Sequence, residues 1–174
     1  MDSYKAINEY LNTINLKIGY LRGNFANKLC CICQAPYITP IYEKMVISML
    51  VNDIDNEFFS TAIFDTNDLR MPIANCIYHL DEDNRATIHL LCKAESCKIP
   101  RIGAMLLYFV CYALRDYGTD IIELNTTDNK QAIKLYEGIG FVRQEEPNSD
   151  TMLLDTSKIN PFIMKGGRSK AMKF

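Results

Sequence analysis

The chain has 174 residues and a formal net charge of −2, with 48% hydrophobic and 23% charged residues. A sequence of this length and balance suits one soluble domain with a single hydrophobic core. The low net charge argues against a general nucleic-acid binder, which needs concentrated lysine and arginine. Four of the last ten residues are basic and none is acidic. We therefore expect one domain at 1–160 and a basic, flexible tail at 161–174.

The N-terminal part of the chain is predicted to hold three helices and one strand. Apolar residues at helical spacing indicate a helix at 3–13. Alternating apolar residues then indicate a strand that begins at Leu16 and ends at 22–23. Two further helices are predicted at 25–34 and 41–51, on either side of a proline-containing turn.

Three strands are predicted next, at 58–64, 73–80 and 86–93. The turns between them are short and rich in Asp and Asn, which suit tight turns. Consecutive strands joined in this way favour an antiparallel meander.

The C-terminal part alternates helices and strands. A helix at 102–117 is apolar nearly all round, so we expect it to be sandwiched between other elements, and Gly118 is suited to end it. The elements expected after it are a strand at 121–126, a helix at 129–139, and strands at 141–146 and 151–155. This succession after a meander predicts a mixed α/β sheet with one parallel region.

The sequence shows no targeting or membrane signal. Its N-terminus lacks a basic region followed by an apolar stretch, so no secretory signal is expected. The longest apolar run, 105–114, is shorter than the ~20 residues of a membrane helix. The seven cysteines suit a compartment in which thiols stay reduced. We therefore expect a soluble, cytoplasmic protein that binds neither membrane nor nucleic acid.

Cysteine spacing raises thiol and zinc chemistry as alternatives. Cys30 and Cys33 form a C-x-x-C, but a structural zinc site normally needs a second ligand pair at similar spacing. His79 and His89 are each expected to lie singly on a strand. The flanks of the C-x-x-C also differ from those of a thioredoxin-like motif. Small buried thiols and no metal are the expectation.

The first candidate site is the start of the apolar helix. A helix N-terminus offers free backbone N–H groups and a positive dipole end, which suit a phosphate. Pro100 is expected in the first turn, where its missing N–H is not needed. Gly103 would let the backbone approach a ligand, and Lys98 and Arg101 add positive charge. A plain helix start with two solvated bases explains the segment equally well.

The second candidate site is the helix at 129–139. Asn129 can cap its first turn and Gly140 can end it, and neither feature requires a function. Tyr136 lies on the same face as Ala132. It could be a core tyrosine with its hydroxyl at the edge. It could also be a general acid, because a phenol with a pKa near ~10 is protonated at neutral pH.

The two segments together resemble the GNAT superfamily of N-acetyltransferases. The pattern N-x-x-A-x-x-L-Y-x-x-x-G-F is carried by Asn129, Ala132, Leu135, Tyr136, Gly140 and Phe141. The family's phosphate-binding loop, Q/R-x-x-G-x-G/A, opens the preceding helix. In this chain Lys98 stands at its first position, Arg101 at the first glycine and Gly103 at the last position. The order of elements from 58 to 155 is also similar to that of the family.

The resemblance implies a fold and a set of binding residues. It implies a mostly antiparallel sheet, flanked by helices, in which the parallel strands 86–93 and 121–126 splay apart. The donor would be acetyl-coenzyme A, held in the splay and at the loop. The residues expected to bind it are Cys92, Lys93, Lys98, Arg101, Ile102, Gly103, Ala104, Asn129 and Tyr136.

The resemblance also implies direct transfer of the acetyl group to a primary amine. Tyr136 would protonate the departing thiolate. The base that deprotonates the amine is not evident from the motif. Glu123 is the first candidate, either directly or through water, and His89 is a second, because its ordinary pKa lies near neutrality.

Two other functions remain open at this level. One is a non-catalytic acyl-coenzyme A-binding regulator on the same fold, because Arg101 and Pro100 alter the loop. The other is a thiol or zinc protein that uses Cys30 and Cys33. The expected partners are acetyl-coenzyme A and an amine acceptor, either a small molecule or a peptide, and a homodimer is left open. The acidic body outside the tail favours a cationic acceptor such as a polyamine or basic peptide.

Overall fold

The computed structural model describes residues 3–21, 48, 57–126, 129–145 and 149–163. Its helices are α1 (Ser3–Thr13), α3 (Ile102–Tyr117), α4 (Lys130–Ile139) and the short 3₁₀ helix η2 (Thr156–Lys158). Its strands are β1 (Leu16–Leu21), β2 (Phe58–Asp65), β3 (Asp68–Asp81), β4 (Arg85–Lys93), β5 (Ile121–Asn125), β6 (Val142–Arg143) and β7 (Thr151–Asp155). The helices expected at 25–34 and 41–51, and the end of the tail, lie outside the described residues.

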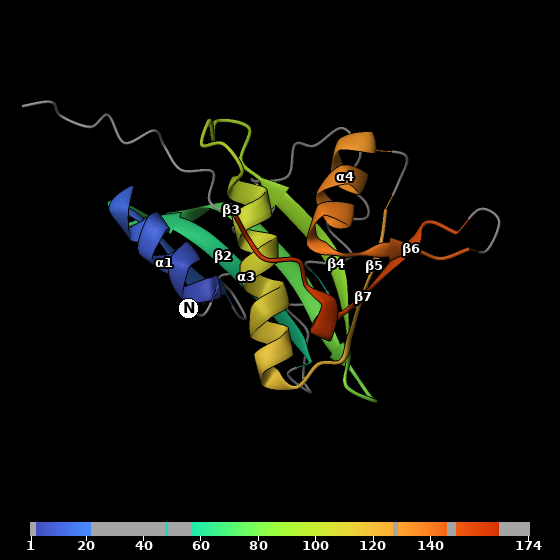
Figure 1. Ribbon diagram of the computed structural model, residues 1–174. Coiled ribbons are helices and arrows are strands. Elements are labelled where there is room, and N and C mark those ends of the chain that lie inside the picture. Colours follow the sequence, from blue (N-terminus) through green and yellow to red (C-terminus); the bar gives the residue numbers. More distant parts are fainter. Residues whose placement is uncertain (1–2, 22–47, 49–56, 127–128, 146–148, 164–174) are drawn as a thin grey trace, which may run out of the picture.

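The strands form one seven-stranded sheet in the order β1-β2-β3-β4-β5-β7-β6. Neighbouring strands are antiparallel, except that β4 and β5 run parallel. Helices α1, α3 and α4 lie on one face of this sheet (Figure 1). We call it the helix face and the other the opposite face. The predicted mixed sheet with one parallel pair is confirmed.

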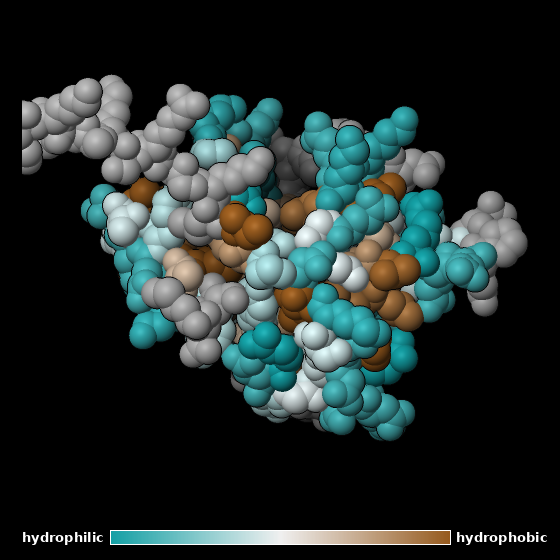
Figure 2. Space-filling model, in the orientation of Figure 1, coloured by the Kyte–Doolittle hydropathy of each residue, from teal (hydrophilic) through white to brown (hydrophobic). Residues whose placement is uncertain are grey.

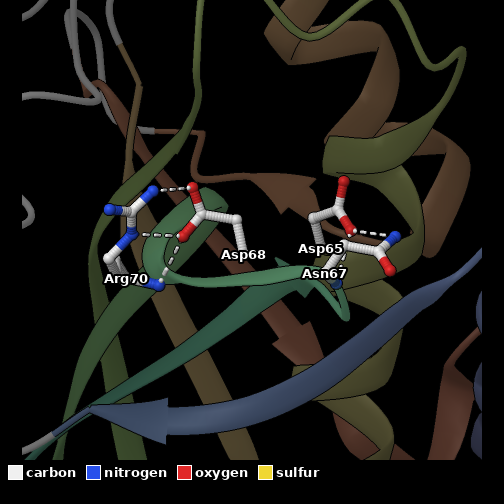
Figure 3. Close-up of polar contacts among 4 residues, drawn as sticks. All are labelled: Asp65, Asn67, Asp68 and Arg70. Atoms are coloured by element: carbon white, nitrogen blue, oxygen red, sulfur yellow. Dashed lines mark hydrogen bonds and ion pairs between the residues drawn. The ribbon is translucent and has the colours of Figure 1, made fainter.

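Polar side chains stabilise the first turn of the meander β2-β3-β4. In the first turn the Asp65 carboxylate accepts hydrogen bonds from the backbone N–H of Asn67 at 2.8 Å and from its side chain at 3.0 Å (Figure 3). Asp68 binds Arg70 through two hydrogen bonds of 2.8 and 2.9 Å (Figure 3). This pairing lowers the pKa of Asp68 to about 2. Pairing with β2 begins at Asp68, directly after the turn. Strand β3 therefore starts earlier than the predicted strand at 73–80.

The core lies between the sheet and α3. Ten of the sixteen residues of α3 are buried, as expected for a helix that is apolar nearly all round. Ile7 and Leu11 of α1 are fully buried in the same cluster, and Tyr4 meets Phe109 edge to face at 5.9 Å. On this face, apolar side chains reach the surface in patches over α3 and beside β6, between hydrophilic ones (Figure 2). Among the described residues, no helix combines the length and hydropathy needed to cross a membrane.

The predicted bounds of α3, 102–117, are confirmed, and so are the predicted residues that cap α3 and α4. Gly118 follows α3 with φ 102°. The side chain of Asn129 accepts hydrogen bonds from the backbone of residues 131 and 132, and Gly140 ends α4 with φ 121°. Pro100 is a correction, because α3 begins at Ile102 and Arg101 is its N-cap, so the proline precedes the helix instead of standing in its first turn. Strand β6 is shorter than the predicted 141–146.

Strands β4 and β5 separate part-way along their length. They pair through four residues each, and Ile88 opposite Leu124 is the last pair. On its other side β4 carries a bulge: Tyr78 pairs with Ile88 and Ile77 with Leu90, so His89 is the extra residue. A bulge bends its strand and increases the local twist. No described strand pairs with the β5 side of β4 from His89 to Lys93, which gives the splay that the resemblance implied.

We predict that Gly140→Ala destabilises the protein while Gly138→Ala does not. At Gly140 the left-handed φ of 121° is combined with a close approach, since an added Cβ would lie 3.0 Å from the carbonyl oxygen of Lys158. The expected loss in the free energy of unfolding is about 1–3 kcal/mol. Gly138 lies inside α4 with nothing within 4 Å of an added Cβ, so alanine there should be neutral or stabilise by up to about 1 kcal/mol. Urea unfolding measures both, and equal effects would contradict the account.

Candidate active site

The splay begins the site on the helix face. Beyond Ile88, the edge of β4 that faces β5 has no strand partner among the described residues. Cys92 is buried on β4 opposite Asn75, and Lys93 is exposed at the end of the strand. Both predicted residues therefore lie on the open length of β4. The chain then leaves the sheet and leads directly to the start of α3.

The start of α3 presents three backbone amides. The first intrahelical bond runs from the N–H of Met105 to the carbonyl of Arg101 at 2.9 Å, so the amides of residues 102–104 precede it. A Cβ added at Gly103 would meet nothing within 4 Å, so the space in front of the helix is open there. An anion is stabilised at such a position by the free N–H groups and the helix dipole. Ile102, Gly103 and Ala104 thus stand together as predicted.

Arg101 holds an unusual backbone conformation for a side chain of its size. Its φ of 61° and ψ of 13° lie in the left-handed region, which costs a non-glycine residue about 1–2 kcal/mol. Its guanidinium does not cap the helix. Instead it donates a hydrogen bond to the carbonyl oxygen of Ile163 at 3.0 Å and stacks over the ring of Phe162 at 4.9 Å. Lys98 is exposed, and its ammonium donates to the carbonyl of Glu95 at 3.3 Å.

The C-terminal segment that holds Arg101 runs along α3, and we call residues 159–163 the strap. The hydroxyl of Tyr112 donates to the carbonyl of Asn160 at 3.2 Å and accepts from the N–H of Phe162 at 3.2 Å. The ring of Phe162 also packs on Tyr108 at 4.9 Å. The strap therefore connects the C-terminal half of α3 to its N-terminal loop.

Helix α4 places Tyr136 on the same face as the start of α3. The hydroxyl of Tyr108 on α3 donates to the carbonyl of Gly138 at 3.1 Å, and Ile139 and Phe141 join the core beneath α3. Tyr136 packs edge to face on Phe141 with ring centres 5.9 Å apart. Among the described residues its hydroxyl makes no hydrogen bond. Burial raises the pKa of Tyr136 to about 12, with a smaller contribution from the buried Cys76.

Glu123 lies apart from this group, on the opposite face of the sheet. Its neighbours on β5, Ile122 and Leu124, are buried beneath α3, so the alternation of the strand turns Glu123 the other way. Its carboxylate is 3.2 Å from the guanidinium of Arg85. It pairs across the sheet with Thr87, one position before the last β4–β5 pair.

The two histidines are neighbours instead of single residues, which corrects the expectation for them. Nδ1 of His79 lies 2.5 Å from Nε2 of His89, and Nε2 of His79 contacts the carboxylate of Asp81. Both rings stack beneath Phe58, with centres 5.0 and 5.7 Å from it. In the described part of the chain no group of three residues is arranged to hold a metal ion. Cys30 and Cys33 lie outside that part.

A family model described as Acetyltransferase (GNAT) family matches residues 27–141. The chain belongs to the GNAT family. The match covers the open length of β4, the start of α3 and the whole of α4. No curated protein matches the chain by sequence.

Solved structures of acetyltransferases share the fold at low sequence identity. The ribosomal-protein-S18-alanine N-acetyltransferase of Escherichia coli is 19% identical with a TM-score of 0.66, over 86% of this chain and 99% of that one. PaiA N-acetyltransferase of Thermoplasma acidophilum, in complex with coenzyme A, is 17% identical with a TM-score of 0.63, over 80% and 98%. A GNAT family acetyltransferase of Brucella melitensis, in complex with acetyl-CoA, is 13% identical with a TM-score of 0.62, over 84% and 91%.

Three features of this GNAT site were not anticipated from the sequence. The left-handed backbone at Arg101 is the conformation that the glycine of the family pattern adopts most easily, so the pattern itself indicated it. The histidine pair depends on the bulge of β4, because the turn at 82–84 sets a register in which His79 lies opposite Thr87. The strap has no periodic pattern, and nothing in its sequence indicates that it binds α3.

Proposed function

We propose that this GNAT protein is an N-acetyltransferase that moves an acetyl group from acetyl-coenzyme A to a primary amine by direct transfer. The observation that supports this most strongly is that the open edge of β4 leads to the three amides at the start of α3, with Tyr136 on the same face. This arrangement offers an extended strand edge for the amide-containing arm of coenzyme A, an anion site for its phosphates at the end of that edge, and a proton donor. The coenzyme A and acetyl-CoA complexes of the structural neighbours support the choice of donor.

The residues of the loop suit the phosphates of the donor. The amides of residues 102–104 would donate hydrogen bonds to the pyrophosphate, and the open space at Gly103 would admit it. Lys98 would add positive charge from solvent. Arg101 keeps the loop in its left-handed turn, and the strap holds its guanidinium beside the same loop.

The remaining contacts concern the thioester arm. Backbone groups near Cys92 and Lys93 on the open edge of β4 would orient its amides. Asn129 uses its side-chain oxygen for the cap of α4, at 3.1 and 3.3 Å from two amides, so only its side-chain N–H₂ is left to donate to the arm.

Acetyl transfer requires two proton movements. The lone pair of the neutral amine attacks the thioester carbonyl, the C–N bond forms and the C–S bond breaks, so sulfur leaves as a thiolate. Tyr136 would give its phenolic proton to that thiolate. Burial of the ring keeps the pKa of Tyr136 at about 12, which holds the proton on the hydroxyl across the neutral range. The amine proton has to leave to a base on the acceptor side, and the sequence predicts Glu123 or His89.

We predict that Gly103→Glu weakens coenzyme A binding while keeping the fold. A carboxylate in the first turn of α3 interacts favourably with the helix dipole, so the free energy of unfolding should stay level or rise by about 0.3–1 kcal/mol. The same charge repels a pyrophosphate, and the affinity should fall about tenfold or more. Calorimetric titration with coenzyme A measures it, with Gly103→Gln as the control of similar size. Unchanged affinity in the glutamate variant would contradict the loop as the phosphate site.

We predict that Tyr136→Phe lowers kcat about 10²-fold or more, because it removes a general acid. The hydroxyl makes no hydrogen bond among the described residues, so stability and coenzyme A affinity should change little. In the wild type, Tyr136 should contribute no fall in rate below about pH 10, since its pKa lies near 12. Release of free coenzyme A, followed with a thiol reagent across pH, measures both. An unchanged kcat in the phenylalanine variant would remove Tyr136 from the reaction.

The experiment that tests the function is coenzyme A release with a panel of amines. The panel should hold polyamines, lysine-containing basic peptides, amino sugars and a peptide that begins with alanine. The last is included because one structural neighbour is a ribosomal-protein-S18-alanine N-acetyltransferase. Turnover above hydrolysis with at least one amine is the expected result. Binding of acetyl-CoA without turnover of any amine would instead support a non-catalytic acyl-coenzyme A-binding regulator.

A further inference from the structure

The strap, residues 159–163, lies beyond the residues 27–141 that the family model matches, and it forms neither helix nor strand. Its sequence favours an extended segment. Pro161 fixes its own φ at about −65° and restricts the preceding Asn160 to an extended backbone. Pro161 also has no N–H that would need a partner. The strap is therefore largely pre-ordered before it makes any contact.

The first half of the strap is fixed to the end of α4. The last carbonyls of a helix have no partner within the helix, and the strap supplies partners for two of them. The N–H of Asn160 donates to the carbonyl of Ile139 at 2.8 Å, and its side-chain N–H₂ donates to that of Gly138 at 3.1 Å. The carbonyl of Gly138 also accepts from Tyr108 on α3. Helices α3 and α4 and the strap thus meet at one point.

The second half of the strap is fixed to α3. The hydroxyl of Tyr112 donates to the carbonyl of Asn160 and accepts from the N–H of Phe162, both at 3.2 Å. The half-buried ring of Phe162 packs on Tyr108 with ring centres 4.9 Å apart. The guanidinium of Arg101 lies over the same Phe162 ring, 4.9 Å from its centre. A ring that α3 holds in place therefore supports Arg101.

Arg101 needs such a support because its backbone is strained. Its φ of 61° and ψ of 13° lie in the left-handed region, which is unfavourable for a residue with a side chain. Two contacts oppose its relaxation, the stacking on Phe162 and the hydrogen bond of 3.0 Å to the carbonyl of Ile163. The carbonyl of Arg101 accepts the first hydrogen bond of α3. Relaxation of this residue would therefore disturb the start of the helix and the orientation of the amides of residues 102–104.

We propose that Phe162 is a positioning residue of the cofactor site, which acts through Arg101 to hold the phosphate-binding loop in its left-handed turn. This role rests on the acetyl-coenzyme A site proposed above, and it adds to that site a segment outside the family pattern. Phe162 itself need not touch the donor. It raises the fraction of molecules whose loop is arranged to bind the pyrophosphate, and the apparent affinity follows that fraction.

A double-mutant cycle on coenzyme A affinity tests the proposal. Phe162→Leu keeps an apolar side chain against Tyr108 but removes the aromatic face that Arg101 contacts. The affinity should fall about two- to fivefold, as expected for the loss of one exposed cation–π contact. Glycine adopts the left-handed turn without support, so Phe162→Leu should have no further effect in an Arg101→Gly background. Calorimetric titration with coenzyme A measures the wild type and the three variants.

A merely structural role of Phe162 predicts a different result. If the ring served only to pack on Tyr108, Phe162→Leu would lower the affinity by the same factor with arginine or glycine at position 101. Phe162→Tyr keeps the ring face and should retain wild-type affinity. Tyr117→Leu removes a 76% exposed ring at the other end of α3 and is the matched control, with unchanged affinity expected. Equal effects of Phe162→Leu in the two backgrounds, or no effect in either, would overturn the proposal.

A second measurement leaves Phe162 unchanged. Coupling between two sites is reciprocal, so coenzyme A bound at the loop should stabilise the strap. The amide of Phe162 should therefore exchange its hydrogen more slowly when coenzyme A is saturating. In Arg101→Gly the same amide should show no such change. Equal exchange of the Phe162 amide in the wild type with and without coenzyme A would contradict the coupling.

The role of Phe162 and the proposed function can fail separately, because neither measurement needs an amine acceptor. Coenzyme A binding with the predicted coupling, but without acetylation of any amine, would support the role of Phe162 and overturn the transferase function. With an amine that is acetylated, Phe162→Leu should raise the KM for acetyl-CoA and leave kcat unchanged. A fall in kcat without a change in KM would overturn the positioning role alone. A wild type that does not bind coenzyme A would overturn both.

Discussion

The structure depends on one interruption of hydrogen bonding, the end of β4–β5 pairing after Ile88 and Leu124. Two local causes act there. His89 is inserted into β4 as a bulge, which bends the strand, and the other edge of β5 is already paired with β7 as far as Asn125. An open edge inside a sheet would be a liability for pairing with other chains. Here the open edge of β4 lies beside β5 within one domain. It therefore forms an extended opening in the sheet, with different side chains on its two faces.

The helix face supplies rigidity and the anion site. The sixteen residues of α3 are mostly buried, so the amides at its start are held by the whole core. Arg101 accepts a left-handed backbone that costs about 1–2 kcal/mol. Its hydrogen bond to Ile163 and its stacking on Phe162 offset that cost. Both contacts need the guanidinium, which explains why an arginine occupies a position where the GNAT pattern has glycine. The strap and the loop therefore depend on each other.

The sequence was informative where local periodicity and turn chemistry decide the structure. Helix α3, the cap at Asn129 and the ends at Gly118 and Gly140 follow from such patterns, and the fold followed from the motif on α4. The bulge did not follow, because polar and apolar residues alternate without interruption from Arg85 to Leu90, so the extra residue leaves no mark on the pattern. The contact between His79 and His89 depends on that register, and the position of the strap depends on tertiary packing against Tyr108 and Tyr112. Long-range geometry of this kind leaves no local signal.

The central claim is that the open length of β4 and the start of α3 form one cofactor site. Residue-resolved amide hydrogen exchange, with and without saturating coenzyme A, tests it most directly. The account predicts slower exchange at amides within 89–93 and at 102–104, because a bound arm and pyrophosphate would accept hydrogen bonds from them. The amides of β1 and β2, at the far side of the sheet, should exchange at unchanged rates. Coenzyme A binding that leaves 89–93 and 102–104 unprotected would contradict the account.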